Sequence, residues 1–207
     1  MFVDVGANLG YWSLKVSSKQ FNKKNALAIE PLKSNYNFLK KNQSDNKRRF
    51  KILNIGIGEK NKYSKIFYSD SLSNVGASIN KYNESNLLNS EIIKIDTIDN
   101  ILSNKRDKKF IIKLDVEGNE INALKGAKRT LKKDCLIIYE DHGKDNMHLV
   151  SKYFMKKKYS IFFFNHEKVC ELKKINELDS IKKLKHKGYN FFTTKSLFFK
   201  KNLQKIC

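Results

Sequence analysis

The sequence predicts an α/β fold in which βαβ units build a mainly parallel sheet. Two observations carry this prediction: apolar runs of strand length alternate with stretches of helical period, and several of these runs end in turns that contain glycine. The 207 residues, 40% of them hydrophobic, suffice for one compact domain with its own core. No internal repeat and no linker rich in Pro or Ser interrupts the chain, so residues 1–207 are predicted to form a single domain.

The predicted elements follow one another in the order that βαβ units require. The only proline, Pro31, stops the second strand and suits the first turn of a helix, where its missing N–H costs nothing. In that helix Leu32, Tyr36 and Leu39 form one apolar stripe. The other predicted helices are Tyr11–Phe21, Thr97–Leu102, Ile121–Lys132 and Met147–Lys157. The predicted strands are Phe2–Val5, Ala26–Glu30, Phe50–Gly58, Tyr63–Tyr68, Glu91–Ile95, Phe110–Leu114, Cys135–Tyr139, Tyr159–Asn165 and Tyr189–Thr194.

The chain is strongly basic. Lys and Arg number 42 against 21 Asp and Glu, which gives a formal charge of +21 and invites a nucleic-acid or anionic-surface interpretation. Only four of the basic residues are Arg, although the bidentate guanidinium is the usual group for reading phosphates and guanine edges. Because the lysines are spread over the whole chain, we interpret the excess mainly as a bias of solvated surfaces, with an anionic partner as the alternative.

The cysteines and the apolar runs argue against zinc-binding, disulfide-rich and membrane-spanning proteins. Cys135, Cys170 and Cys207 stand far apart, with neither a C-x-x-C pair nor a His at ligand spacing, which argues against a zinc site and a disulfide framework. No apolar stretch approaches the ~20 residues of a membrane span. Asp4 interrupts the N-terminal apolar run, so no signal peptide is predicted, and the expected compartment is the cytoplasm.

A glycine turn follows the first predicted strand. Gly6, Asn8 and Gly10 lie in the stretch 4–10, where glycines permit a tight turn and a close approach of the backbone to a ligand. The spacing G-x-x-x-G differs from the dinucleotide pattern, and no Lys-Ser/Thr pair follows, as a phosphate-binding loop would need. The alternative is a strand-to-helix turn that binds nothing.

Glu30 ends the second strand, so its carboxylate is expected to act on the same ligand as this turn. A carboxylate at that place accepts both hydroxyls of a ribose when a nucleoside lies across the edge of the sheet. A solvent-facing Glu before a helix is the alternative for the residue taken alone. Together, the turn and Glu30 indicate an adenosine-like cofactor, without deciding whether it carries a hydride or a methyl group.

Two further strands deliver carboxylates to the same edge. The stretch Lys113–Glu120 places Asp115 and Glu117 after an apolar strand, and Glu140–His142 follows the next strand. Acidic side chains at such places are costly unless they meet a cation, a metal or hydrogen-bond donors. Pairing with the abundant lysines is the structural alternative. Beside these carboxylates, His142 is a candidate base.

Three motifs together resemble the FkbM family of S-adenosylmethionine-dependent methyltransferases. They are Phe2–Tyr11, Ala28–Pro31 and Ile112–Glu120 followed by Leu124–Ala127, and their order and spacing agree over roughly residues 2–142. The resemblance implies a single Rossmann-like three-layer α/β/α sandwich, with a seven-stranded sheet whose last strand is antiparallel. It also implies S-adenosyl-L-methionine as donor and O-methylation of a hydroxyl on a sugar, a glycan or a secondary metabolite.

The resemblance also implies roles for individual residues. Gly6, Asn8 and Gly10 would line the methionine and ribose of the cofactor, Asp4 would hold the turn or the amino group, and Glu30 would take the ribose hydroxyls. The turn after Gly58 would border the adenine. Asp115 and Glu117 would face the methyl group and the acceptor. Our hypothesis for the reaction is that Asp115 orients the acceptor or the cofactor and that His142 or Glu117 takes the proton.

Several alternatives stay open at this point. A divalent metal held by Asp115, Glu117 and Glu140 is one, since hard cations choose carboxylate oxygens. A nucleic-acid methyltransferase is favoured by the charge, but no N-P-P-Y motif or RNA-binding module supports it. A non-catalytic scaffold is the third. Family members usually carry a segment before the first motif, so a first strand at Phe2 predicts either a minimal form or a chain incomplete at its N-terminus, which bears on cofactor affinity.

Overall fold

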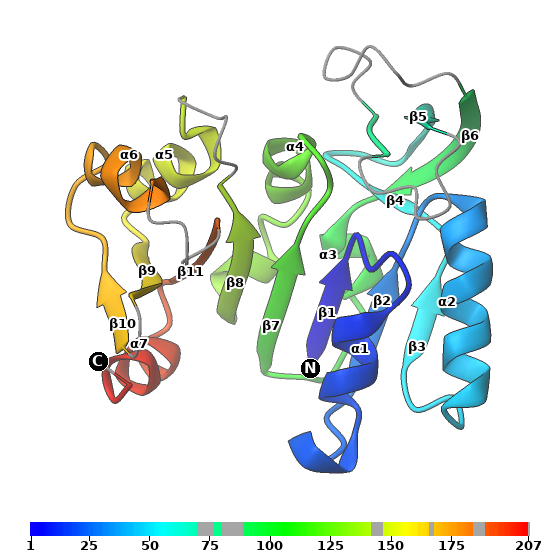
Figure 1. Ribbon diagram of the computed structural model, residues 1–207, viewed down its shortest axis with the longest axis horizontal. Coiled ribbons are helices and arrows are strands. Elements are labelled where there is room, and N and C mark those ends of the chain that lie inside the picture. The colour runs from blue at the N-terminus through cyan, green and yellow to red at the C-terminus, as the bar shows by residue number, and fades with distance from the viewer. Residues whose placement is uncertain (70–76, 80–88, 142–146, 166–167, 184–188, 207) are drawn as a thin grey trace. The chain divides into compact units, whose positions relative to one another are not determined.

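The computed structural model describes residues 1–69, 77–79, 89–141, 147–165, 168–183 and 189–206 (Figure 1). Its chain divides into two compact units. Unit 1 comprises residues 1–107 and 113–130, and unit 2 comprises residues 108–112 and 131–207. The strand β7 contributes to both.

The main sheet has eight strands in the order β10-β9-β11-β8-β7-β1-β2-β3. Strands β1, β2 and β3 pair in parallel, whereas β11 runs antiparallel to both β8 and β9, and β10 runs antiparallel to β9. The α/β class and the antiparallel last strand are therefore confirmed, and the sheet has one strand more than expected because β10 extends its edge. The strands are β1 Phe2–Val5, β2 Ala26–Ile29, β3 Lys51–Leu53, β7 Lys109–Leu114, β8 Asp134–Glu140, β9 Ser160–Asn165, β10 Lys168–Glu171 and β11 Asn190–Thr194.

The core of unit 1 is built on β1 and β2, whose residues are all buried. The helices α1 (Tyr11–Val16) and α2 (Lys33–Asp45) cover the same face of β1–β3 (Figure 1), as consecutive right-handed crossovers in one direction require. Of the predicted stripe, Leu39 in α2 and Leu32 directly before its first turn are fully buried, and Tyr36 is half-buried.

The predicted strand Phe50–Gly58 is wrong as a single element. It forms β3 in the main sheet and β4 (Gly56–Ile57) in a second sheet of order β4-β6-β5, with β5 at Lys62–Tyr68 and β6 at Asn89–Asp96. The break lies at Asn54, whose side-chain Nδ2 donates to the carbonyl oxygens of Glu30 and Pro31 at 2.9 and 2.8 Å. These bonds hold Asn54 to the segment that follows β2.

The observed helices are shorter than the predicted ones. Helix α1 ends at Val16 and is followed by a 3-10 helix, η1 (Lys19–Phe21), and α4 (Glu120–Lys125) ends before Gly126. A Cβ atom at Gly126 would lie 2.0 Å from the carbonyl oxygen of Gly58, so this position admits only glycine. The remaining helices are α3 Ile98–Ile101, η3 Thr130–Lys132, α5 Leu149–Lys156, α6 Glu177–Lys182 and α7 Leu197–Gln204.

Two further expectations concern the cysteines and membrane spans. Cys135 and Cys170 are free, and burial raises the pKa of the Cys135 thiol to about 12, so it stays protonated as a small core side chain. Cys207 lies outside the described residues. Among the helices of the described ranges, none is both long and apolar enough to cross a bilayer.

Candidate functional site

The turn after β1 has the backbone conformation that its glycines predict. Gly6, Asn8 and Gly10 all have positive φ, at 77°, 49° and 85°. The backbone N–H groups of Gly6 and Ala7 both donate to the carbonyl oxygen of Ile29 at 3.0 Å, which fixes the turn to the end of β2. A Cβ atom at Gly6 would lie 1.7 Å from the backbone oxygen of Asp115. Glycine is therefore required here, because the ends of β1 and β7 touch.

Asp4 lies beneath this turn and is completely buried. Its Oδ2 accepts hydrogen bonds from the backbone N–H and the hydroxyl of Ser13, at 3.2 and 2.8 Å. Its Oδ1 is buried as well and has no hydrogen-bond partner among the described residues. Burial raises the pKa of Asp4, while the charge of Lys113 and the bonds from Ser13 oppose the rise. A carboxylate oxygen held without a donor is an open acceptor position.

Glu30 meets the same turn, as the sequence predicts for the ends of adjacent parallel strands. Its Oε2 accepts from the backbone N–H of Asn8 at 2.8 Å, and its Oε1 accepts from that of Leu32 at 3.1 Å. The residue is 5% exposed, and burial raises its pKa to about 7. The Asn35 side chain hydrogen-bonds the same carboxylate. Since an ionised carboxylate has about four acceptor positions, roughly one remains for a ligand.

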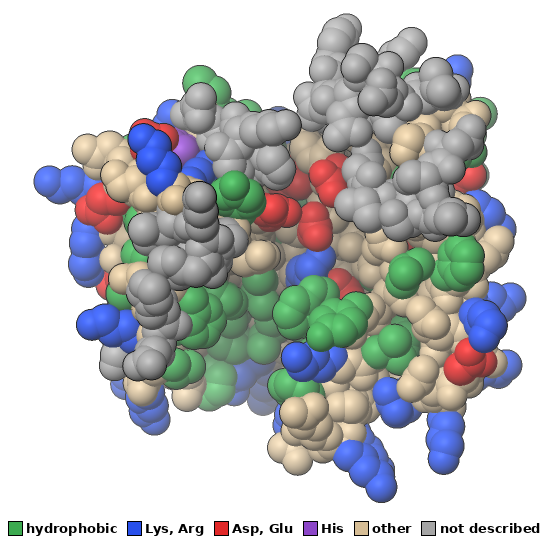
Figure 2. Space-filling model, viewed as in Figure 1, with side chains coloured by type: hydrophobic (Ala, Val, Ile, Leu, Met, Phe, Trp, Pro, Cys, Tyr) green, Lys and Arg blue, Asp and Glu red, His purple; other side chains and the backbone are tan. Residues whose placement is uncertain are grey.

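The two carboxylates after β7 lie closer to solvent, and Figure 2 shows acidic side chains beside the upper end of β1. Asp115 forms an ion pair with Lys113, whose Nζ is 2.8 Å from Oδ2, and the Asp115 side chain is 36% exposed. Glu117 is exposed and has a positive φ of 47°, and its carbonyl oxygen accepts from the Ser78 hydroxyl at 2.8 Å. The structure thus brings Asp4, Gly6 and Asp115 together within unit 1.

Gly58 is buried in packing. Its backbone N–H donates to the carbonyl oxygen of Asp96 at 3.0 Å, and a Cβ atom there would lie 2.8 Å from a methyl group of Ile95. The adjacent β4 residue Ile57 accepts from the buried side chain of Asn119 at 2.8 Å. These contacts give Gly58 a structural reason to be glycine, while the role of the following turn beside an adenine stays a prediction.

Sequence reasoning missed two residues that shape the acidic loop after β7. Glu120 accepts the backbone N–H groups of Val116 and Gly118, both at 3.2 Å, and Asn119 ties the loop to β4. The available signal was the position of both residues at the start of α4, where such side chains commonly bond to the backbone. These bonds set the orientation of the loop that carries Asp115 and Glu117.

In unit 2, the candidate base His142 lies outside the described residues. Its neighbour Asp141 is 1% exposed and forms an ion pair with Lys182 of α6, while its other oxygen accepts from the Ser151 hydroxyl of α5. His148 completes the cluster, with Nδ1 at 2.8 Å from the Lys182 Nζ and Nε2 at 3.0 Å from Asp179. This cluster, missed in the sequence, fastens α5 and α6 to the end of β8.

A metal site is not assembled within the described ranges. Among those residues, no group of three or more His, Cys, Asp or Glu side chains is arranged to hold an ion. Asp115 instead takes Lys113 as its cation.

Comparison with protein families identifies one matching domain. A family model described as "Methyltransferase FkbM domain" matches residues 4–189, which includes every motif named above except the first two residues of Phe2–Tyr11. No curated protein matches the chain.

Solved structures give similarity of fold. An FkbM methyltransferase from Methylobacillus flagellatus is 19% identical with a TM-score of 0.59, over 93% of this chain and 42% of that one. A precorrin-6y C5,15-methyltransferase from Geobacter metallireducens is 11% identical with a TM-score of 0.50, over 94% of this chain and 78% of that one. The chain therefore spans less than half the length of the first of these proteins.

Proposed function

Since the chain belongs to the FkbM methyltransferase domain family, we propose that it transfers the methyl group of S-adenosylmethionine to a hydroxyl of a sugar, a glycan or a secondary metabolite. The observation that carries this proposal is the buried Oδ1 of Asp4, which has no donor among the described residues although it lies beneath a ligand-type glycine turn. An unsatisfied buried carboxylate oxygen is costly unless a ligand completes it.

The residues of unit 1 fit the parts of such a cofactor. Asp4 offers an acceptor to its ammonium group, and Glu30 offers its remaining acceptor capacity to the ribose hydroxyls. The positive φ values at Gly6 and Gly10 let the backbone of the turn approach the ligand closely. The half-exposed Asp115 supplies negative charge for a sulfonium.

S-adenosylmethionine supplies, when bound, an electrophilic methyl group that an acceptor oxygen attacks as the carbon–sulfur bond breaks. We assign the alignment of the acceptor to Asp115, whose carboxylate is held by Lys113 at 2.8 Å. The hydroxyl proton passes to the exposed carboxylate of Glu117 or to the imidazole of His142, a contribution of about 10²–10⁴-fold.

Calorimetry with S-adenosylmethionine tests the cofactor assignment through Asp4. We expect Asp4→Asn to weaken binding by about tenfold or more, because it removes a charge-assisted bond. Ser13→Ala is the matched control, since it removes a donor to Oδ2 and leaves Oδ1 in place. Equal affinity in Asp4→Asn and the unaltered protein would contradict the assignment.

A second measurement tests Asp115. Asp115→Asn should weaken the binding of S-adenosylmethionine more than that of the product S-adenosylhomocysteine, because the sulfonium of the first carries a positive charge that the thioether of the second lacks. Methyl transfer should fall in Asp115→Asn and in His142→Ala. Turnover at the unaltered rate in both variants would exclude the proposed roles.

The basic charge of the chain favours one other candidate, a nucleic-acid methyltransferase. It predicts binding to mixed RNA with a steep negative slope of log affinity against log salt. A non-catalytic scaffold predicts no binding of S-adenosylmethionine at all. The RNA titration at varied salt and the calorimetry with S-adenosylmethionine use the same protein, and together they separate the three functions.

A further inference from the structure

The segment from Tyr11 to Lys24 presents aromatic rings and lysines on the surface of unit 1. Tyr11, Trp12 and Phe21 are 63%, 46% and 38% exposed. Lys19, Lys23 and Lys24 are exposed as well. We call these side chains, together with Lys15, the aromatic–lysine patch.

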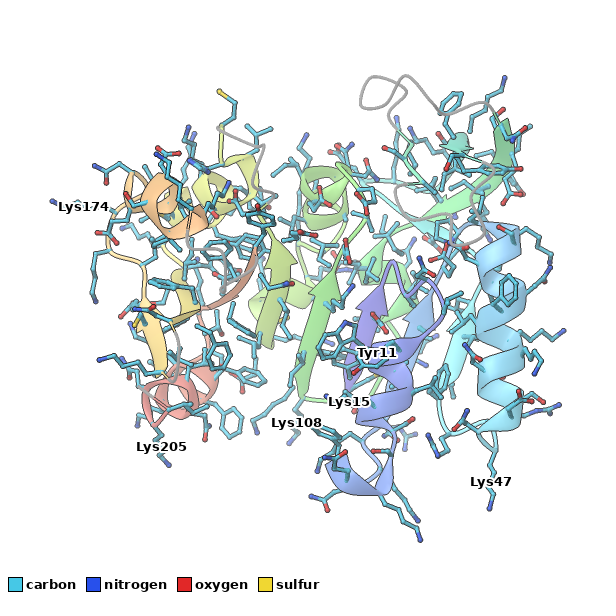
Figure 3. All side chains as sticks on the ribbon, viewed as in Figure 1. Tyr11, Lys15, Lys47, Lys108, Lys174 and Lys205 are labelled. Carbon is cyan, nitrogen blue, oxygen red and sulfur yellow. The ribbon has the colours of Figure 1, made fainter. Side chains whose placement is uncertain are left out.

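The rings of the patch are organised around one ammonium group. The Lys15 Nζ lies 5.9 Å from the ring centre of Tyr11 and 5.8 Å from those of Trp12 and Phe21. Tyr11 and Trp12 meet edge to face at 5.4 Å. Tyr11 and Lys15 lie one turn apart on α1, and Figure 3 labels both. Three large rings are thus held at the surface in a defined arrangement, with a cation among them.

The charge around the patch is mainly positive, with Asp45 at the end of α2 as an exposed acidic residue. Residues 5–29 contain no Asp or Glu. After α2, the basic residues Lys47, Arg48 and Arg49 are exposed, and the Arg49 guanidinium donates to the carbonyl oxygen of Leu14 in α1 at 3.4 Å. Figure 2 shows Lys and Arg side chains along the lower rim of the part built from α1 and α2. The acidic residues of the candidate site lie at the carboxyl ends of β1 and β7, where α1 begins at Tyr11.

We propose that the aromatic–lysine patch docks unit 1 on an anionic lipid bilayer. Tyr and Trp are the side chains that reside at the interface between water and hydrocarbon, because each combines an apolar ring with a polar group. Lysines beside them meet anionic headgroups as point charges. The three exposed rings and the lysines together favour a bilayer, and binding to RNA is the competing outcome of the test below.

The patch lies next to the candidate site in the sequence, but the proposed membrane binding does not depend on the function of that site. Tyr11 directly follows Gly10, the last glycine of the turn. A bilayer bound there would lie beside the turn, and membrane binding would be measurable whether or not methyl transfer occurs.

Trp12 makes the test direct, because it is the only tryptophan of the chain. The full chain is titrated with vesicles of phosphatidylcholine containing phosphatidylglycerol, and with vesicles of phosphatidylcholine alone. We expect a blue shift of Trp12 emission and quenching by brominated acyl chains with the anionic vesicles only. Absence of the shift with anionic vesicles, or an equal shift with both kinds, would overturn the proposal.

Charge-matched variants separate the patch from the general positive charge. Replacing Lys19, Lys23 and Lys24 by Gln should weaken vesicle binding in cosedimentation by about 100-fold, at about fivefold for each lysine. The control replaces three exposed lysines of the β4–β5 region, Lys60, Lys62 and Lys65, and should change binding by less than about fivefold. Equal losses in the two triple variants would overturn the assignment to the patch.

The aromatic contribution has its own matched pair. Phe21→Ala should weaken vesicle binding, while Phe38→Ala, which removes a 53% exposed ring from α2, should not. Mixed RNA serves as the competing probe at the same salt concentration. If RNA binds more tightly than the anionic vesicles and shifts Trp12 emission, the patch is a nucleic-acid surface and the proposal is overturned.

Discussion

Two buried aspartates, one in each unit, are held in opposite ways. Asp141 in unit 2 has both carboxylate oxygens satisfied, one by Lys182 and the other by Ser151. Asp4 in unit 1 accepts two hydrogen bonds from Ser13 on Oδ2 and has a buried Oδ1 without a partner among the described residues. Both side chains are excluded from solvent, so the difference lies in what compensates the charge.

The comparison separates a structural carboxylate from one suited to a ligand. A buried charge with a cation and a hydroxyl against it is compensated within the fold, and it fastens the elements that supply those groups. At Asp4, burial is the largest effect on the pKa and raises it, although the charge of Lys113 opposes the rise. Glu30 resembles Asp4 in this respect, because burial raises its pKa to about 7 against hydrogen bonds from the backbone of Asn8 and Leu32 and the side chain of Asn35.

The largest effect is expected at Lys182. Lys182→Met leaves Asp141 buried without its cation, and we expect a loss of about 3–5 kcal/mol in the free energy of unfolding. Urea denaturation measures it, with Lys183→Met as control, because Lys183 is exposed on the neighbouring position. A loss below about 1 kcal/mol would show that Asp141 does not depend on this ion pair.

Glu30 should give the unit 1 site a pH-dependent stability. Because its pKa rises from 4.5 to about 7 on folding, the folded protein retains a proton that the unfolded chain releases. The resulting stabilisation is fully present below about pH 4.5 and is lost as the pH rises through about 7. We expect a contribution of about 3 kcal/mol to the free energy of unfolding at low pH. Glu30→Gln should abolish this pH dependence, because the amide does not titrate. Unfolding free energies compared at about pH 5 and pH 8 measure this difference, and parallel pH profiles would contradict it.

Gly6 is expected to tolerate no side chain. Gly6→Ala forces a Cβ against the Asp115 backbone, at a place where φ is already 77°, so we expect a loss of about 2–3 kcal/mol and weaker cofactor binding. Gly118→Ala is the control, since Gly118 has a similar φ of 89° in an exposed loop. If both variants lose the same stability, backbone strain alone explains Gly6, and the contact of β1 with β7 does not matter.

The sequence predicts the unit 1 turn better than any other part of the molecule. Asn8 and Glu30, 22 positions apart, meet because the ends of adjacent parallel strands meet. What the motif does not reveal is that Glu30 is 5% exposed and bonded to the backbone of Asn8 and Leu32, since these bonds depend on how the turn and the start of α2 fold around it. Nor does it reveal the turn at Asn54. The same turn divides the predicted strand Phe50–Gly58.

The unit 2 cluster is beyond sequence reasoning for a physical reason. Nothing in the sequence distinguishes Lys182 from the other lysines of this basic chain. His148 falls in the predicted helix Met147–Lys157, whereas in the structure it precedes α5 and has a positive φ of 49°. Their meeting with Asp141 depends on the packing of α5 and α6, and α6 has no strong local signal. The single-domain prediction stays a prediction.

The smallest effect sharpens the contrast between the two aspartates. Ser13→Ala removes one of two donors to Asp4 Oδ2, so we expect a loss of about 1 kcal/mol in unfolding free energy. Ser151→Ala should cost more, about 2 kcal/mol, because the Ser151 hydroxyl bonds both Asp141 and, at 2.8 Å, the buried Tyr139 hydroxyl. Denaturation of both variants under one condition gives the order. A larger loss in Ser13→Ala would mean that Asp4 depends on its internal donor as much as Asp141 does, which would remove the reason to reserve Asp4 for a ligand.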